Sequence, residues 1–126
     1  MKSYTDIEQS RKLAEKLPIE SADMYYCYGM DIHTKVWSFD DTPTIIDNSN
    51  QIDVDYDIPC WSLAALLEAL PDELEDNHFL TLLKEKDEYC CCYEDINGNS
   101  FTHVFAGNAI DACYEMILKL HELKML

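Results

Sequence analysis

The chain has 126 residues, of which 9 are Lys or Arg and 25 are Asp or Glu, so its formal net charge is −16. With 48% hydrophobic and 27% charged residues, it has enough apolar material for a folded core, which excludes disorder of the whole chain. A surface with this net negative charge would repel phosphate backbones and anionic lipid headgroups. The composition therefore disfavours direct binding of nucleic acid or of a membrane surface.

The N-terminal residues become polar and acidic where a secretory signal would need an apolar stretch. No later segment reaches 18 consecutive apolar residues, the length typical of a membrane-spanning helix. We therefore expect a cytoplasmic protein. In that compartment the six cysteines are expected to be free thiols.

The first predicted helix covers residues 6–17. Thr5 and Glu8 have the Thr-x-x-Glu spacing of a capping box, and Pro18 ends the apolar stripe that follows. Residues 22–57 have no sustained hydrophobic period, so we expect an irregular segment with short extended pieces at 24–28 and 36–39. A second, short helix is predicted from the leucines of residues 63–70, with Ser62 as its N-cap and Pro71 at its end.

The second half of the chain predicts three strands and a helix. The strands cover residues 78–84, 88–94 and 101–106, with turns at 85–87 and at Asn97-Gly98. These turns would place Cys92 beside Leu80 on one neighbouring strand and beside His103 on the other. Asn108 can cap a final helix over 109–123, whose apolar arc is so wide that a homodimer through it is left open.

Together these elements predict one α+β domain over residues 1–126. Its centre is a three-stranded antiparallel meander, flanked by an N-terminal helix, a short central helix and a C-terminal helix in the order α-loop-α-β-β-β-α. The chain has no internal repeat and no Gly/Ser-rich linker that would suggest a second domain.

Three segments of the chain resemble a family of small acidic proteins encoded by gut Bacteroides genomes, prophages and mobile elements. They lie within residues 8–24, 58–71 and 111–126, and include Leu17-Pro18-Ile19-Glu20-Ser21-Ala22-Asp23-Met24, Ile58-Pro59-Cys60-Trp61-Ser62-Leu63 and Asp111-Ala112-Cys113-Tyr114-Glu115-Met116-Ile117. The family has no assigned activity. The resemblance implies a bacterial cytoplasmic setting and supplies no catalytic residues.

Cysteine and histidine residues offer an alternative function as a metal- or thiol-dependent enzyme. Cys90, Cys92 and His103 could meet on one sheet face, with His78 near the strand end, and such a set suits zinc. The paired Cys-x-x-Cys units of structural zinc sites are absent, so buried thiols are the favoured interpretation. Cys60 near a helix start could be a nucleophile, although packing against Trp61 explains it better. We expect no metal, no cofactor and no catalysis.

The distribution of charge is the most informative feature. Residues 36–83 contain eleven acids and no Lys or Arg, and aromatic side chains concentrate just before and within this stretch. For the charge alone, a solvated acidic face that only keeps the protein soluble is the favoured explanation. The working hypothesis for function is a protein partner with a basic surface, and mimicry of nucleic acid towards a DNA- or RNA-binding protein stays open as an alternative. A satellite core under a long loop is the alternative explanation of the aromatic residues. The candidate interaction residues are Tyr25, Tyr26, Tyr28, Trp37, Asp53, Asp55 and Asp57.

Overall fold

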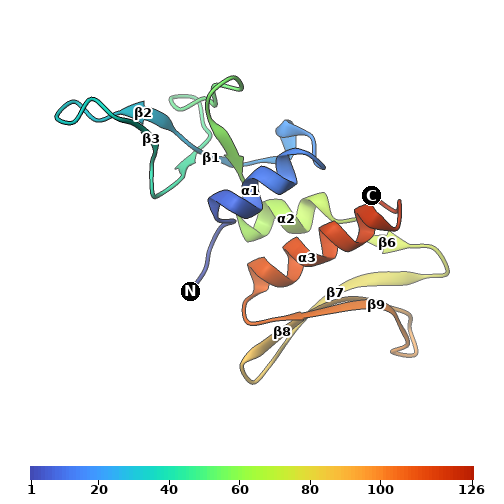
Figure 1. Cartoon of the computed structure of the whole chain (residues 1–126). Coiled ribbons are helices and arrows are strands. Elements are labelled where there is room, and N and C mark those ends of the chain that lie inside the picture. The colour runs from blue at the N-terminus through green and yellow to red at the C-terminus, as the bar shows by residue number, and fades with distance from the viewer. The chain divides into compact units, whose positions relative to one another are not determined.

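The computed structural model describes residues 1–126, which form two compact units (Figure 1). The hairpin unit comprises Tyr4–Ala65, and the sheet–helix unit comprises Met1–Ser3 and Leu66–Leu126. Helices and antiparallel strands occur together, so the expectation of a mixed α+β fold is confirmed. The single domain over residues 1–126 stays a prediction. None of the helices combines the length and the apolar character needed to cross a membrane.

The hairpin unit contains one α-helix, a 3₁₀ helix and five short strands. β1 lies between β4 and β5 in a three-stranded antiparallel sheet, and β2 pairs with β3 in a separate two-stranded ribbon. The elements are α1 (Ile7–Ala14), η1 (Ile19–Ser21), β1 (Met24–Tyr26), β2 (Tyr28–Met30), β3 (Trp37–Phe39), β4 (Thr44–Ile45) and β5 (Ile58–Cys60).

The start of α1 differs from the prediction. Asp6 is the N-cap and forms a capping box with Gln9, whereas Thr5 and Glu8 were expected to do so. Thr5 is buried, where its hydroxyl lies 2.8 Å from the Ser10 hydroxyl and accepts the backbone N–H of Trp61 at 3.2 Å. Because these bonds occupy the Thr5 side chain, the next residue, Asp6, caps the helix. The helix ends at Ala14, three residues before the predicted end.

A small apolar core holds the hairpin unit together. Tyr26 from β1 packs with Ile58 and Cys60 from the neighbouring strand β5. The Tyr26 hydroxyl donates a hydrogen bond of 2.8 Å to the carbonyl of Thr5, which satisfies its polar end inside the core. Burial of these side chains therefore anchors β1 and β5 to the segment that precedes α1.

The sheet–helix unit is a four-stranded antiparallel sheet with a long helix across one face (Figure 1). Its strand order is β6-β7-β8-β9, and α3 packs on β8 and β9. The boundary between the two units falls within α2. The elements are α2 (Leu63–Ala69), β6 (Glu73–Leu74), β7 (His78–Glu85), β8 (Glu88–Glu94), β9 (Ser100–Ala106) and α3 (Ala109–Glu122).

The predicted order α-loop-α-β-β-β-α is therefore too simple, because the chain has nine strands in three sheets. The three strands of the meander were found, but β6, β4 and β5 were missed. Each of these has only two or three residues, too few for an alternating pattern to be visible in the sequence. Ser62 was correctly identified as the N-cap of α2, since its hydroxyl accepts the N–H of Ala65 at 3.3 Å.

The predicted register is half correct. Cys92 lies opposite His103 on β9 as expected, but opposite Thr81 on β7 and not Leu80. The β7–β8 turn leaves two residues between the paired Glu85 and Glu88, one fewer than predicted. Lys86 in this turn adopts a φ of 51°, a left-handed conformation that is uncommon for residues other than glycine and shortens the turn.

Helix α3 begins as predicted. The side chain of its N-cap Asn108 accepts the N–H of Asp111 at 2.8 Å, and the Asp111 carboxylate also accepts a hydrogen bond from the Lys2 ammonium at 2.9 Å. The apolar arc of the helix is buried within the chain, including Met116 and Ile117. The width of that arc therefore does not by itself require a second subunit.

Candidate functional site

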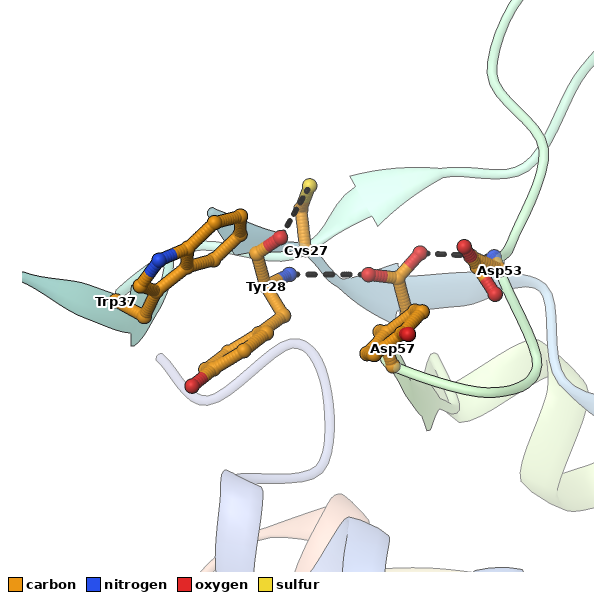
Figure 2. A pocket seen from close by; sticks show the side chains of 6 residues that line it. Cys27, Tyr28, Trp37, Asp53 and Asp57 are labelled. Carbon is orange, nitrogen blue, oxygen red and sulfur yellow. Dashed lines mark hydrogen bonds between the residues drawn. The ribbon is translucent and has the colours of Figure 1, made fainter. Parts of the chain in front are cut away.

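A cavity of about 690 Å³ in the hairpin unit brings together side chains from three separate segments (Figure 2). The first segment is the start of β2, the second is β3, and the third is the loop before β5. The walls are aromatic and acidic. The lining residues are Cys27, Tyr28, Trp37, Asp53, Tyr56 and Asp57.

The aromatic wall is built by the pairing of β2 with β3. Tyr28 lies opposite Phe39 in the register, with ring centres 4.8 Å apart, and also stacks on Trp37 at 5.5 Å with 29° between the ring planes. The guanidinium of Arg11 lies 5.3 Å from the centre of the Phe39 ring. A row of three aromatic rings thus ends in a cation–π contact at Phe39, while Trp37 at the other end is 56% exposed.

The acidic wall is built by Asp57, which ties the loop to β2. One carboxylate oxygen of Asp57 accepts the N–H of Tyr28 at 3.0 Å, and the other accepts the N–H of Asp53 at 2.8 Å. Figure 2 shows Asp57 between these two partners. Asp53 in turn accepts the N–H of Asp55 through Oδ1 at 3.0 Å. These bonds give the loop a fixed shape and place both carboxylates at the cavity.

The surroundings of the Cys27 thiol in this cavity favour its neutral form. Burial raises the pKa of Cys27, and the negative charges of Asp57 and Asp40 raise that pKa further. The neutral thiol donates a weak hydrogen bond to the carbonyl of Tyr28. Because the thiolate is the reactive form, the acidic surroundings of Cys27 suppress its reactivity.

Four of the seven predicted interaction residues line the cavity: Tyr28, Trp37, Asp53 and Asp57. The remaining three residues do not. Tyr25 and Tyr26 are buried, and Tyr26 packs in the core with Ile58 and Cys60, so neither tyrosine belongs to an exposed patch. Asp55 is exposed but lies outside the lining.

Two lining residues were missed. Cys27 was overlooked between two tyrosines, and Tyr56 was overlooked between two aspartates of the 53–57 loop. The position of Tyr56 between two acids is a signal in the sequence from which its place in the site could have been predicted.

Cys60 does not occupy a reactive position. It belongs to β5 rather than to a helix start, and no part of it is exposed. Its thiol donates to the carbonyl of Thr5 at 3.3 Å, and burial raises its pKa. Packing, the explanation favoured from the sequence, accounts for this residue.

Cys90, Cys92 and His103 do lie together, along a shallow cavity of about 250 Å³ on the sheet face opposite α3. His78 is not part of this lining, and its Nδ1 lies 3.1 Å from the carbonyl of Glu75. Burial and the neighbouring Cys90 raise the pKa of Cys92 to about 12. No three His, Cys, Asp or Glu side chains are arranged to hold a metal ion.

The aromatic and acidic cavity is the candidate site with the most defined geometry. No known protein family, no curated protein and no solved structure matches this chain. Its function must therefore be inferred from its own side chains.

Proposed function

We propose that this chain is a small, non-enzymatic binding protein that attaches to a basic protein partner by receiving a cationic side chain in the cavity of the hairpin unit. The observation that carries the proposal is the meeting of Tyr28, Trp37, Asp53 and Asp57 around one cavity, although they come from distant parts of the sequence. Aromatic faces combined with carboxylates are the surroundings that Arg and Lys side chains prefer.

The charge of the surroundings supports a cationic ligand. Residues 36–83 contain no Lys or Arg, so the β3 and loop segments of the cavity bring no base of their own. Asp53 and Asp57 present two carboxylates, and the net charge of −16 would attract a basic protein over longer distances.

The aromatic row supports a planar cation. Arg11 already places its guanidinium over Phe39, at one end of the row that continues through Tyr28 to Trp37. The exposed Trp37 face can receive a second guanidinium in the same way, because Arg stacks on aromatic rings and pairs with carboxylates. We infer an arginine side chain of the partner as the preferred ligand.

The sequence resemblance supports a setting for this function. It suggests a bacterial mobile element or prophage as the origin of the chain, and the cytoplasm as its location. In such a setting we propose that the protein acts as an accessory factor which binds a basic protein.

Titration with single amino-acid derivatives tests the site directly. We expect N-acetyl-arginine amide to shift the indole N–H resonance of Trp37 with about millimolar affinity, because one cation–π contact and one charged hydrogen bond contribute only a few kcal/mol. N-acetyl-citrulline amide has a similar shape without the charge and should produce no saturable shift. Equal shifts with both compounds would contradict the proposal.

A pair of variants locates the binding. Trp37→Ala removes the exposed aromatic face and should abolish the arginine-dependent shifts of the remaining cavity residues. Ile32→Ala is the matched control, since Ile32 is 76% exposed in the turn of the same hairpin and does not line the cavity. Loss of binding in both variants would show that the hairpin acts only as a general apolar surface.

A further inference from the structure

The sheet of the sheet–helix unit has an outer face, opposite α3, that carries exposed apolar side chains. Leu83, Cys90 and Phe105 lie in one row across three strands, because Cys90 is the register partner of both others. Phe79, on the same face of β7, is 47% exposed, Leu83 is 44% exposed and Phe105 is 56% exposed. The shallow cavity of about 250 Å³ described above lies on this face, with Leu83 and Phe105 in its lining.

The same face is acidic at both ends. Glu85 and Glu88 pair with each other next to the β7–β8 turn, and Glu94 pairs with Phe79 at the opposite end. No strand residue on this face is Lys or Arg. Lys84 belongs to the opposite face, where its ammonium lies 5.8 Å from the centre of the Tyr89 ring.

We propose that the outer face binds an extended segment of another protein that presents apolar side chains flanked by Lys or Arg. The apolar side chains would cover Leu83 and Phe105, and the cations would approach Glu85 and Glu94. Exposed apolar patches with a polar rim are typical of protein interaction sites. At the β7–β8 end of the rim, Lys86 is outnumbered by Glu85, Asp87 and Glu88, so the charge of the rim favours a basic partner.

A second copy of this chain fits the face poorly. Two copies packed face to face would bring Glu85, Glu88 and Glu94 of one copy close to the same carboxylates of the other. Each copy also carries a net charge of −16, so the repulsion extends beyond the rim. The proposed surface contains none of the residues of the hairpin-unit cavity and is independent of the function proposed above.

Two synthetic peptides test the proposal. One alternates Lys and Leu, the other alternates Lys and Ser, so both carry the same charge and only the first has apolar side chains. We expect the Lys/Leu peptide to bind at least about tenfold more tightly in fluorescence anisotropy, since burying even one leucine contributes about that factor. Equal affinities would overturn the proposal, because they would reflect only the general attraction to a negative protein.

Variants of the chain test whether the outer face causes the difference in affinity between the two peptides. The double variant Leu83→Ser/Phe105→Ser should remove the preference for the Lys/Leu peptide, and far-UV circular dichroism together with urea unfolding shows whether it is folded. Ile96→Ser is the matched control, because Ile96 is 95% exposed in the β8–β9 turn. Trp37→Ala should keep the preference, which separates this surface from the cavity. A preference that persists in the folded double variant would overturn the proposal.

Sedimentation velocity tests whether a second copy of the chain covers the outer face. We expect the chain to remain monomeric at low and high concentration in about 0.1 M salt. A dimer that forms in the unmodified chain and disappears in Leu83→Ser/Phe105→Ser would show that a second copy, and not a basic segment, covers this face. That result would also overturn the proposal.

Discussion

The β2–β3 and β7–β8 hairpins are both antiparallel, but they are held in different ways. β7–β8 is continued by a strand on each side and packs against α3 through β8. β2–β3 is an isolated pair of three-residue strands, a structure that is marginally stable in water by itself. The candidate site is therefore built on the less supported hairpin, whose shape depends on a few side-chain contacts.

Those contacts are identifiable in the structure. Asp57 fixes the backbone of β2, and the row of Phe39, Tyr28 and Trp37 links the two strands. In the turn, Asp31 accepts the N–H of His33 at 2.7 Å. The β7–β8 hairpin instead depends on a buried core. Substitution of core residues should therefore affect β7–β8, and substitution of the polar residues named above should affect β2–β3.

The largest effect is expected from a core substitution in the sheet–helix unit. Ile117→Ala on α3 removes a fully buried side chain and should lower the free energy of unfolding by about 2–5 kcal/mol, as measured by urea denaturation. Glu115→Ala, an exposed position on the same helix, should change it by less than about 0.5 kcal/mol. Similar effects of both variants would show that α3 does not support the sheet.

Alkaline pH should weaken the sheet through its buried thiols. The pKa of Cys92 is raised from 9.0 to about 12 in the fold, so above pH 9 the unfolded chain releases a proton that the folded chain retains. This thiol therefore leaves the stability unchanged below pH 9, and lowers it between pH 9 and 12 by at most about 1.4 kcal/mol per pH unit. Urea unfolding at several pH values should show a shallower decline for Cys92→Ala than for the unmodified chain. An identical decline would contradict the assignment to Cys92.

Removal of the Asp57 carboxylate should loosen the β2–β3 hairpin alone. Asp57→Ala leaves the N–H groups of Tyr28 and Asp53 without their acceptors, at a local cost of about 1–3 kcal/mol. Hydrogen exchange of β2–β3 amides should become at least about fivefold faster, whereas exchange of β7–β9 amides should not change. Asp55→Ala serves as the control, and equal acceleration in both variants would argue against the role of Asp57.

The smallest effect concerns the end of the aromatic row. Arg11→Gln removes the guanidinium from the Phe39 ring and should cost about 0.5–1 kcal/mol at this partly exposed site. The expected readout is a change in the chemical shifts of Phe39 and Tyr28 with little change in global unfolding. Unaltered shifts at both rings would mean that the contact contributes nothing to the hairpin.

The sequence predicted the elements of the sheet–helix unit closely, because their signals are local. The boundaries of β8 and the cap at Asn108 agree with the structure. The two-residue strand β6 was missed, and the β7–β8 register differs by one residue at a turn in which Lys86 has a positive φ. A non-glycine residue with positive φ leaves no reliable mark in the sequence, so this error could not be foreseen.

The hairpin unit was harder to predict, because its strands pair over long sequence separations. The partnership of β1 with β5 joins Tyr26 to Ile58, and nothing in either segment indicates the other. Tyr28, Trp37, Asp53 and Asp57, which were selected from the sequence, line the cavity, and their role in binding stays a prediction. The burial of Tyr25 and Tyr26 depends on strands that were not predicted, and was missed for that reason.

We propose that the cavity, and not the overall negative charge, selects the cationic ligand. Asp53→Asn and Asp55→Asn each remove one charge from the same loop, but only Asp53 lines the cavity. With a short arginine-containing peptide, we predict that Asp53→Asn raises the dissociation constant about tenfold, whereas Asp55→Asn changes it less than about twofold. Equal weakening by the two variants would show that long-range attraction alone binds the peptide, and would contradict the claim.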